Sequence, residues 1–159
     1  MQIAVIGAVE CTAEEAAAAE TIGHLIAGNR EVLCCGGRGG VMEAACRGAK
    51  GNGGLCVGIL PGTENGNPYL DVHIRSNLGH ARNVVLVESA DAVIAVGGSY
   101  GTLSEIALAL KNELPVFGYW TWEIEGVVSC QTPEEAVLMA VRAARLSPRS
   151  RSPPGAPAP

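Results

Sequence analysis

The stretch AVGGSYGTLSE, residues 95–105, joins an apolar run to a helical pattern through three glycines. A strand, a glycine-rich turn and a helix in this order are typical of α/β proteins with a parallel sheet. The stretch also contains the motif G-x-S-x-G at residues 97–101. It therefore predicts either a hydrolase nucleophile at Ser99 or a glycine loop that holds a phosphate.

The same alternation of apolar runs and helical patterns continues along the chain. We expect strands at residues 2–6, 31–35, 55–59, 91–96 and 115–118, and helices at 13–27, 40–50, 79–89, 102–111 and 133–146. The apolar runs are too continuous for half-exposed strands, which predicts a mainly parallel sheet with helices on both faces. The predicted fold class is α/β, a single Rossmann-like, doubly wound domain over residues 1–146.

Local signals mark helix starts and two irregular segments. Thr12 with Glu15 and Thr132 with Glu135 have the spacing of a capping box. Residues 61–71 form a loop rich in Gly, Asn and Pro whose length hints at function. Residues 147–159, SPRSRSPPGAPAP, lack an apolar period and are rich in proline, so we expect a disordered tail there.

Composition excludes several classes of partner. The net charge of −5 argues against binding to a nucleic-acid backbone. No apolar run reaches the roughly 20 residues of a membrane span, and the N-terminus enters a strand-like run without a basic segment. We therefore expect a cytoplasmic protein. The six cysteines form no C-x-x-C pair, which favours reduced, mostly buried thiols and no metal site.

The hydrolase interpretation of Ser99 lacks partners. An α/β-hydrolase places its acid and its histidine after the nucleophile, whereas His24, His73 and His80 all precede Ser99. A triad of unusual order stays open, because triads are defined by geometry.

The phosphate interpretation draws on the segments that follow four predicted strands. In a parallel sheet these segments meet at one edge, where glycine lets the backbone approach a ligand and helix N-termini attract anions. The predicted ligand-binding residues are Gly7, Gly36, Gly37, Arg38, Gly39, Gly40, Pro61, Gly62, Gly97, Gly98, Ser99, Tyr100, Gly101 and Thr102. The alternative is that the glycines only permit tight turns. Met42 interrupts a full G-x-G-x-x-G and no G-K-[ST] occurs, so we expect neither NAD nor a Walker-type nucleotide site.

Charged residues near this edge have two interpretations each. Glu105 lies three residues after Thr102, so it forms either a third capping box or a carboxylate that stabilises positive charge at a ribose anomeric carbon. Arg82 and Arg38 are either phosphate ligands or solvated surface arginines. His80 is either an acid–base group or a helix cap.

Four segments together resemble the LOG superfamily, formerly called lysine decarboxylase-like, over residues 1–146. They are GGRGGVMEAACRGA (36–49), GILPG (58–62), LGHARN (78–83) and VGGSYGTLSEIALALK (96–111). The superfamily includes cytokinin-activating phosphoribohydrolases and molybdenum-cofactor carrier proteins. On its signature P-G-G-x-G-T-x-x-E, Glu105 matches the catalytic glutamate, Gly98, Gly101 and Thr102 match the phosphate loop, and Arg82 matches the arginine of an R-K pair.

Three departures from that signature favour the cofactor-carrier branch. Gly97 replaces the proline, Ser99 a glycine and Asn83 the lysine. The resemblance therefore implies a protein that binds a phosphorylated, nucleotide-like small molecule, with the molybdenum cofactor as the expected ligand. The alternative is hydrolysis of the N-glycosidic bond of a nucleoside 5′-monophosphate, with Glu105 and Arg82 as catalytic residues. A third hypothesis is a scaffold without a ligand.

The resemblance also implies a homodimer or homotetramer. The apolar faces of residues 84–87 and 106–110 are the expected subunit contact.

Overall fold

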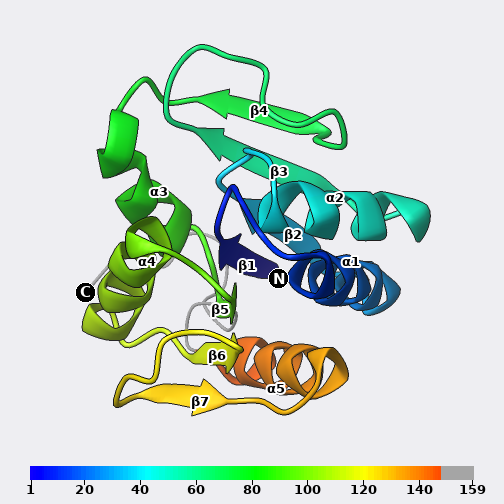
Figure 1. Cartoon of the computed structure of the whole chain (residues 1–159), viewed down its shortest axis with the longest axis vertical. Coiled ribbons are helices and arrows are strands. Elements are labelled where there is room, and N and C mark those ends of the chain that lie inside the picture. Colours follow the sequence, from blue (N-terminus) through cyan, green and yellow to red (C-terminus); the bar gives the residue numbers. More distant parts are fainter. Residues whose placement is uncertain (148–159) are drawn as a thin grey trace, which may run out of the picture.

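The centre of the molecule is a seven-stranded sheet in which every pair of neighbouring strands is parallel (Figure 1). The structure is a computed structural model that describes residues 1–147. The strands are β1 (Gln2–Gly7), β2 (Val32–Cys35), β3 (Cys56–Leu60), β4 (Val72–Arg75), β5 (Ala92–Val96), β6 (Val116–Tyr119) and β7 (Val127–Ser129). The helices are α1 (Ala13–Gly28), α2 (Val41–Gly51), the 3₁₀ turn η1 (Gly79–Ala81), α3 (Arg82–Glu88), α4 (Tyr100–Lys111) and α5 (Pro133–Leu146).

Helices cover both faces of this sheet, as predicted. One face packs against α1, α2 and α5, and the other against α3 and α4 (Figure 1). Alternate residues of β1 enter the two cores: Ile3 and Val5 on one side, Ala4 and Ile6 on the other. All six cysteines are free thiols and five are buried, in agreement with the prediction. The predicted α/β, Rossmann-like class is confirmed.

The strand order β4-β3-β2-β1-β5-β6-β7 places the turning point of the topology between β1 and β5. The chain builds the sheet outward from β1 to β4, returns through α3, and then continues from β5 to β7. The loops that follow β1 and β5 therefore separate toward opposite faces, which leaves a crevice at the carboxyl edge.

The five predicted strands are all present, but two edge strands were missed. Strands β4 and β7 contain four and three residues, and most of these are exposed. Short edge strands carry a weak apolar pattern because only one neighbour covers them. The predicted helix 79–89 is divided into η1 and α3, and α4 begins two residues before the predicted position. The predicted tail lies outside the described residues except for Ser147.

The predicted helix caps are correct at α1 and half correct at α5. The Thr12 hydroxyl accepts from the Glu15 N–H, and the Glu15 carboxylate accepts from the Thr12 N–H. At α5 the Thr132 hydroxyl accepts from the Glu135 N–H. The Glu135 carboxylate accepts from the Gln131 N–H, one residue before the expected partner.

Helices α1 and α2 cross at two glycines that bring the backbones into contact. A Cβ on Gly23 would lie 1.8 Å from the carbonyl oxygen of Ala45, and a Cβ on Gly48 would lie 1.9 Å from that of Glu20. Any side chain at either position therefore pushes α2 off α1. Because α2 begins at the carboxyl edge of the sheet, this crossing also sets the position of its N-terminus.

We expect Gly23→Ala and Gly48→Ala each to lower the free energy of unfolding by about 1–3 kcal/mol or more, the usual effect of overpacking. Gly51→Ala is the matched control, because Gly51 is the last residue of α2 and a Cβ there meets nothing within 4 Å. It should leave stability unchanged or raise it by about 0.4–1 kcal/mol. Urea denaturation followed by circular dichroism measures all three. Equal stability of Gly23→Ala and the parent chain would contradict the crossing described here.

Candidate functional site

A cavity of about 210 Å³ lies at the carboxyl ends of β1 and β5, at the turning point of the topology. Its lining residues come from the loops after β1, β2 and β5 and from η1, α2, α3 and α4: Gly7, Ala8, Val9, Arg38, Met42, His80, Arg82, Asn83, Ser99, Gly101, Thr102 and Glu105. A second cavity of about 270 Å³ shares Arg38, His80 and Arg82 with it and extends to Pro61 and Glu64. The two cavities form one site along the edge where ligands bind in open α/β sheets.

The hydroxyl of Thr102 is the feature of this site that most strongly indicates ligand binding. Thr102 is 2 % exposed, and its Oγ1 is the one buried side-chain oxygen or nitrogen without a hydrogen-bond partner in residues 1–147. A buried polar atom without a partner costs about 1–3 kcal/mol, so native proteins rarely keep one without a purpose. Because Thr102 also lines the cavity, a ligand atom is the natural partner for its hydroxyl.

The helices that begin at this cavity lack side-chain caps. Ser99 at the start of α4 and Gly40 at the start of α2 make no capping bond, whereas Thr12 and Thr132 cap α1 and α5. The first N–H groups of an α-helix have no partner within the helix, and they carry a partial positive charge. The start of α4 therefore offers backbone donors beside the Thr102 hydroxyl.

A buried ion pair forms the floor of the site. The Nη1 atom of Arg82 lies 3.4 Å from Oε1 of Glu105, and the two residues are 7 % and 6 % exposed. Gly36 makes room for the guanidinium, since a Cβ there would lie 2.4 Å from both terminal nitrogens. Arg82 is therefore buried, and the alternative of a solvated surface arginine is wrong. The alternative of a capping box at Glu105 is wrong, because α4 already begins at Tyr100 and Thr102 lies inside its first turn.

Burial sets the charge state of both partners. It raises the pKa of Glu105 to about 7, against the opposing effect of the nearby Arg82 charge. Burial also lowers the pKa of Arg82, and the Glu105 carboxylate partly offsets that effect. The long contact and the raised carboxyl pKa both mean that Glu105 neutralises Arg82 incompletely near neutral pH. The site therefore keeps positive charge for an anion.

The predicted ligand-binding residues divide into two groups. Gly7, Arg38, Pro61, Ser99, Gly101 and Thr102 line the two cavities. The other predicted residues, Gly36, Gly37, Gly39, Gly40, Gly62, Gly97, Gly98 and Tyr100, do not line these two cavities.

Two glycines illustrate the packing role. Gly37, with φ of +70°, packs on Leu60, and a Cβ on Gly40 would lie 2.2 Å from the carbonyl oxygen of Val9. The alternative that glycines permit tight turns therefore describes these two positions. Gly97 and Gly98 line a separate cavity with Trp120 and Trp122, and the Tyr100 ring lies near Trp122.

Sequence reasoning missed the apolar part of the lining. Val9 and Met42 contribute to the cavity, but apolar side chains beside a strand carry no signal of ligand contact. Ala8, which follows Gly7 at the predicted edge, also lines the cavity. Asn83 was noted only as a departure from a family lysine. Its amide donates to Ser104 Oγ at 2.9 Å, which links α3 to α4 beside the site.

The expected subunit faces pack largely within the chain. Leu86, Val87 and Ile106 are fully buried between α3, α4 and the sheet, so they are unavailable to another subunit. Val84 is 43 % exposed and remains accessible.

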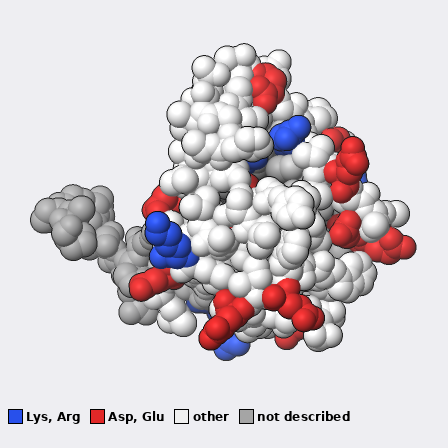
Figure 2. All heavy atoms as spheres, turned by 60° about the vertical axis from the view of Figure 1, so that its left-hand side comes forward, with Lys and Arg blue, Asp and Glu red and all other residues white. Residues whose placement is uncertain are grey.

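On the face shown in Figure 2 the basic side chains are few and separated, and acidic side chains lie at several places around its border. The arginines that line the two cavities are Arg38 and Arg82. Among residues 1–147, no group of three or more His, Cys, Asp or Glu side chains has the arrangement of a metal site. None of the helices in this part of the chain has the length and apolar character of a membrane span.

The fold and the site define a Rossmann-like α/β protein with a small-molecule cavity at the β1/β5 edge. A model of the SLOG cluster4 family matches residues 1–145, and the chain belongs to this family. The chain is 52 % identical over 139 residues to an uncharacterized protein of Archaeoglobus fulgidus. The aligned region covers 86 % of this chain and 92 % of that relative.

Two solved structures are similar over most of their length. The molybdenum cofactor binding protein from the phototrophic bacterium Rippkaea orientalis has a TM-score of 0.84 at 38 % identity, with 89 % of this chain and 95 % of that chain covered. The Moco carrier protein from Chlamydomonas reinhardtii has a TM-score of 0.85 at 30 % identity, with 92 % and 98 % covered. The resemblance to the LOG superfamily, closest to its cofactor-carrier branch, is confirmed.

The raised pKa of Glu105 predicts a pH-dependent stability. A carboxyl whose folded pKa of about 7 exceeds its ordinary value of 4.5 contributes stability below pH 4.5, and this contribution is lost as pH rises through 7. The free energy of unfolding of the parent chain should therefore fall between pH 5 and pH 7.5 relative to Glu105→Gln. Urea denaturation across this range measures the difference, with the exposed Glu113→Gln as control. A parallel pH dependence of the parent chain and Glu105→Gln would show that burial does not shift this carboxyl.

Proposed function

We propose that this protein binds a phosphorylated, nucleotide-like small molecule in the 210 Å³ cavity and serves as a molybdenum-cofactor carrier or binding protein. The observation that carries the proposal is the unpartnered, buried hydroxyl of Thr102 beside the uncapped start of α4. A phosphate group supplies acceptor oxygens for such a hydroxyl and for helix N–H groups at once.

Three kinds of donor converge on the proposed phosphate. The N–H groups in the first turn of α4 supply backbone donors and a favourable helix dipole. Thr102 supplies a hydroxyl, and Arg82 supplies a buried guanidinium with N–H groups beyond its single contact with Glu105. Arginine suits phosphate because its planar fork donates two parallel bonds.

Glu105 would tune this affinity. Its ionised form repels an anion, and its neutral form does not. Because the pKa of Glu105 is about 7, the two forms exchange near physiological pH. Anion binding should therefore weaken as pH rises from 6 to 8, and an amide at position 105 should remove this dependence.

A carrier role agrees better than catalysis with the proteins that this chain resembles. The similar structures at 38 % and 30 % identity are a molybdenum cofactor binding protein and a Moco carrier protein. The molybdenum cofactor carries a terminal phosphate, which the α4 edge would hold without chemical conversion. The three departures at Gly97, Ser99 and Asn83 alter the hydrolase signature while Thr102, Glu105 and Arg82 remain in the cavity. We also propose that the protein is a homodimer or homotetramer, with exposed Val84 at a subunit contact.

Sulfate is the sharpest probe of the phosphate site because it stays a dianion throughout this pH range. Isothermal titration calorimetry should show sulfate binding that tightens from pH 8 to pH 6. Thr102→Val should weaken binding at least fivefold while leaving the chain as stable as the parent or more so, because the lost hydroxyl had no partner. Arg82→Gln should weaken binding at least tenfold. Arg30→Gln, at an exposed position two residues after the end of α1, is the matched control for loss of one positive charge.

Equal sulfate affinity of Thr102→Val and the parent chain would contradict the phosphate site. Binding of the molybdenum cofactor itself should follow the same order of variants. If Thr102→Val and Arg82→Gln bind the cofactor as tightly as the parent chain, the cofactor binds at another site.

The hydrolase alternative predicts the opposite response at Glu105. If this carboxylate stabilised an oxocarbenium-like transition state, Glu105→Gln would cut base release from nucleoside 5′-monophosphates at least about a hundredfold. The carrier proposal expects no base release from either chain and tighter sulfate binding by Glu105→Gln at pH 8.

A further inference from the structure

A larger cavity shares no lining residue with the two cavities of the proposed phosphate site. It has a volume of about 490 Å³, within the usual range for small-molecule sites, and is formed by the loop between β6 and β7. A smaller cavity of about 240 Å³ shares Trp120, Thr121 and Trp122 with it and reaches Gly97 and Gly98. The smaller cavity therefore reaches the glycine loop that precedes α4, and a Cβ on Gly98 of this loop would lie 2.6 Å from Thr102.

Exposed aromatic rings surround this second region. Trp120 and Trp122 are the two tryptophans of the chain, and they are 60 % and 38 % exposed. The ring of Tyr100, the first residue of α4, lies 6.2 Å from that of Trp122 between centroids. Large aromatic surfaces left in solvent around a cavity are suited to stacking on a planar ligand.

The loop that carries these rings is held in place. Thr121 Oγ1 donates to the carbonyl oxygen of Gly97 at 2.5 Å, and the Gly97 N–H donates to the carbonyl oxygen of Tyr119 at 3.1 Å. Trp120 stacks on Tyr119 and has φ of +51°, a left-handed conformation that bulky residues avoid. Backbone strain of this kind persists where the surroundings enforce it, and such positions cluster at ligand sites.

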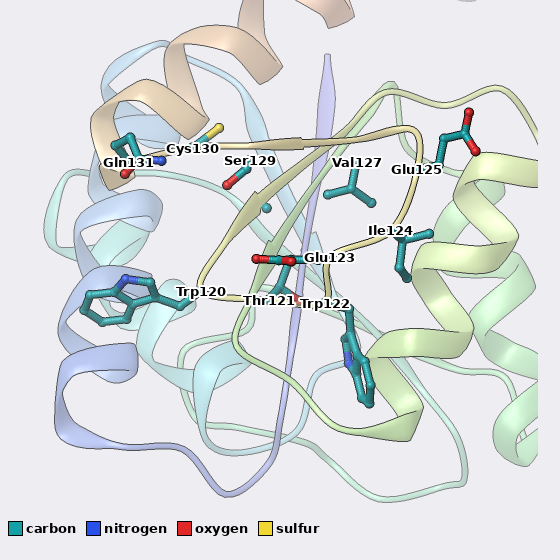
Figure 3. A pocket seen from close by; sticks show the side chains of 11 residues that line it. Trp120, Thr121, Trp122, Glu123, Ile124, Glu125, Val127, Ser129, Cys130 and Gln131 are labelled. Atoms are coloured by element: carbon teal, nitrogen blue, oxygen red, sulfur yellow. The ribbon is translucent and has the colours of Figure 1, made fainter.

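The charges of this region differ from those of the phosphate site. Glu15, Glu123 and Glu125 line the two cavities, and neither lining includes a lysine or an arginine. In Figure 3 Glu123 lies between Trp120 and Trp122, whereas Glu125 points away beyond Ile124. Carboxylates without a basic partner repel a phosphate and accept hydrogen bonds from N–H groups. The occupant is therefore a neutral or cationic group rich in N–H donors.

We propose that Trp120, Trp122, Tyr100 and Glu123 form a subsite for a planar heterocycle with a 2-amino-4-oxopyrimidine edge, the edge shared by pterins and guanine. The rings stack on the heterocycle, and the Glu123 carboxylate accepts from its adjacent amino and ring N–H groups. This inference rests on the proposed function, since the heterocycle is the far end of the ligand whose phosphate lies at α4. Gly97 and Gly98 line the aromatic cavity and precede the start of α4, so the ligand would cross this loop.

Nuclear magnetic resonance of the full, ¹⁵N-labelled chain tests the subsite directly. The two indole N–H signals, assigned with Trp120→Phe and Trp122→Phe, report on this region alone. Titration with 6-hydroxymethylpterin or guanosine, neither of which carries a phosphate, should shift the Trp122 signal saturably. Adenosine, which lacks the 2-amino-4-oxo edge, should bind at least fivefold more weakly. The stronger of the first two ligands identifies whether a pterin or a guanine is preferred.

Variants distinguish a loss of ligand binding from a loss of the folded structure. Glu123→Gln should weaken pterin and guanosine binding at least fivefold with unchanged stability, while Glu113→Gln, at an exposed position outside both cavities, should have no effect. Trp122→Ala should abolish binding. Unmoved indole signals at millimolar ligand, equal binding of adenosine, or equal binding by Glu123→Gln would each overturn the subsite.

A sulfate titration in the same samples distinguishes the two proposals. Sulfate should shift the backbone amide of Gly101 and leave the indole signals in place. If sulfate shifts the Gly101 amide signal and neither heterocycle shifts the indole signals, the subsite is refuted and the phosphate site stands. If the heterocycles shift the indole signals and sulfate does not shift the Gly101 amide signal, the subsite stands and the phosphate site is refuted.

Discussion

The contact between the Arg82 guanidinium and Gly36 determines the character of the site. A Cβ at Gly36 would occupy the position of the guanidinium, so glycine after β2 is what admits a buried positive charge to the carboxyl edge. The charge then lies against Glu105 of α4 at 3.4 Å, on the same cavity as the Thr102 hydroxyl. Buried charges are costly without compensation, and one long contact compensates this arginine only in part. An anion would complete the arrangement.

Thr102 is a residue at which the chain departs from the most stable choice. Its hydroxyl is buried without a partner, although valine has nearly the same shape and would avoid the cost. Proteins depart from the most stable choice mainly at functional positions. The same principle applies to the raised pKa of Glu105, since a carboxyl buried beside an arginine at this distance is an unfavourable choice for stability alone. The proposed anion ligand would explain both choices.

The sequence predicted the architecture well and the use of individual glycines less well. Continuous apolar runs indicated a parallel sheet, and the parallel arrangement alone brought the loops after β1 and β5 to one edge. The sequence could not distinguish Gly36, which accommodates Arg82, from Gly40, which admits the backbone of Val9, because both depend on neighbours distant along the chain. For the same reason the spacing of Thr102 and Glu105 left a cap and a carboxylate at the ligand edge as alternatives, and the fold places Glu105 beside Arg82. Strands β4 and β7 were missed because an edge position weakens the apolar pattern.

The proposed function requires an oxyanion to bind between the start of α4 and Arg82. A crystal structure of the chain soaked with tungstate tests it most directly, because anomalous scattering locates the metal without reference to a model of the ligand. We expect a bound tungstate whose oxygens lie about 3 Å from Thr102 Oγ1 and from the first N–H groups of α4. Tungstate bound only at other surfaces, with the α4 cavity holding none at saturating concentration, would contradict it.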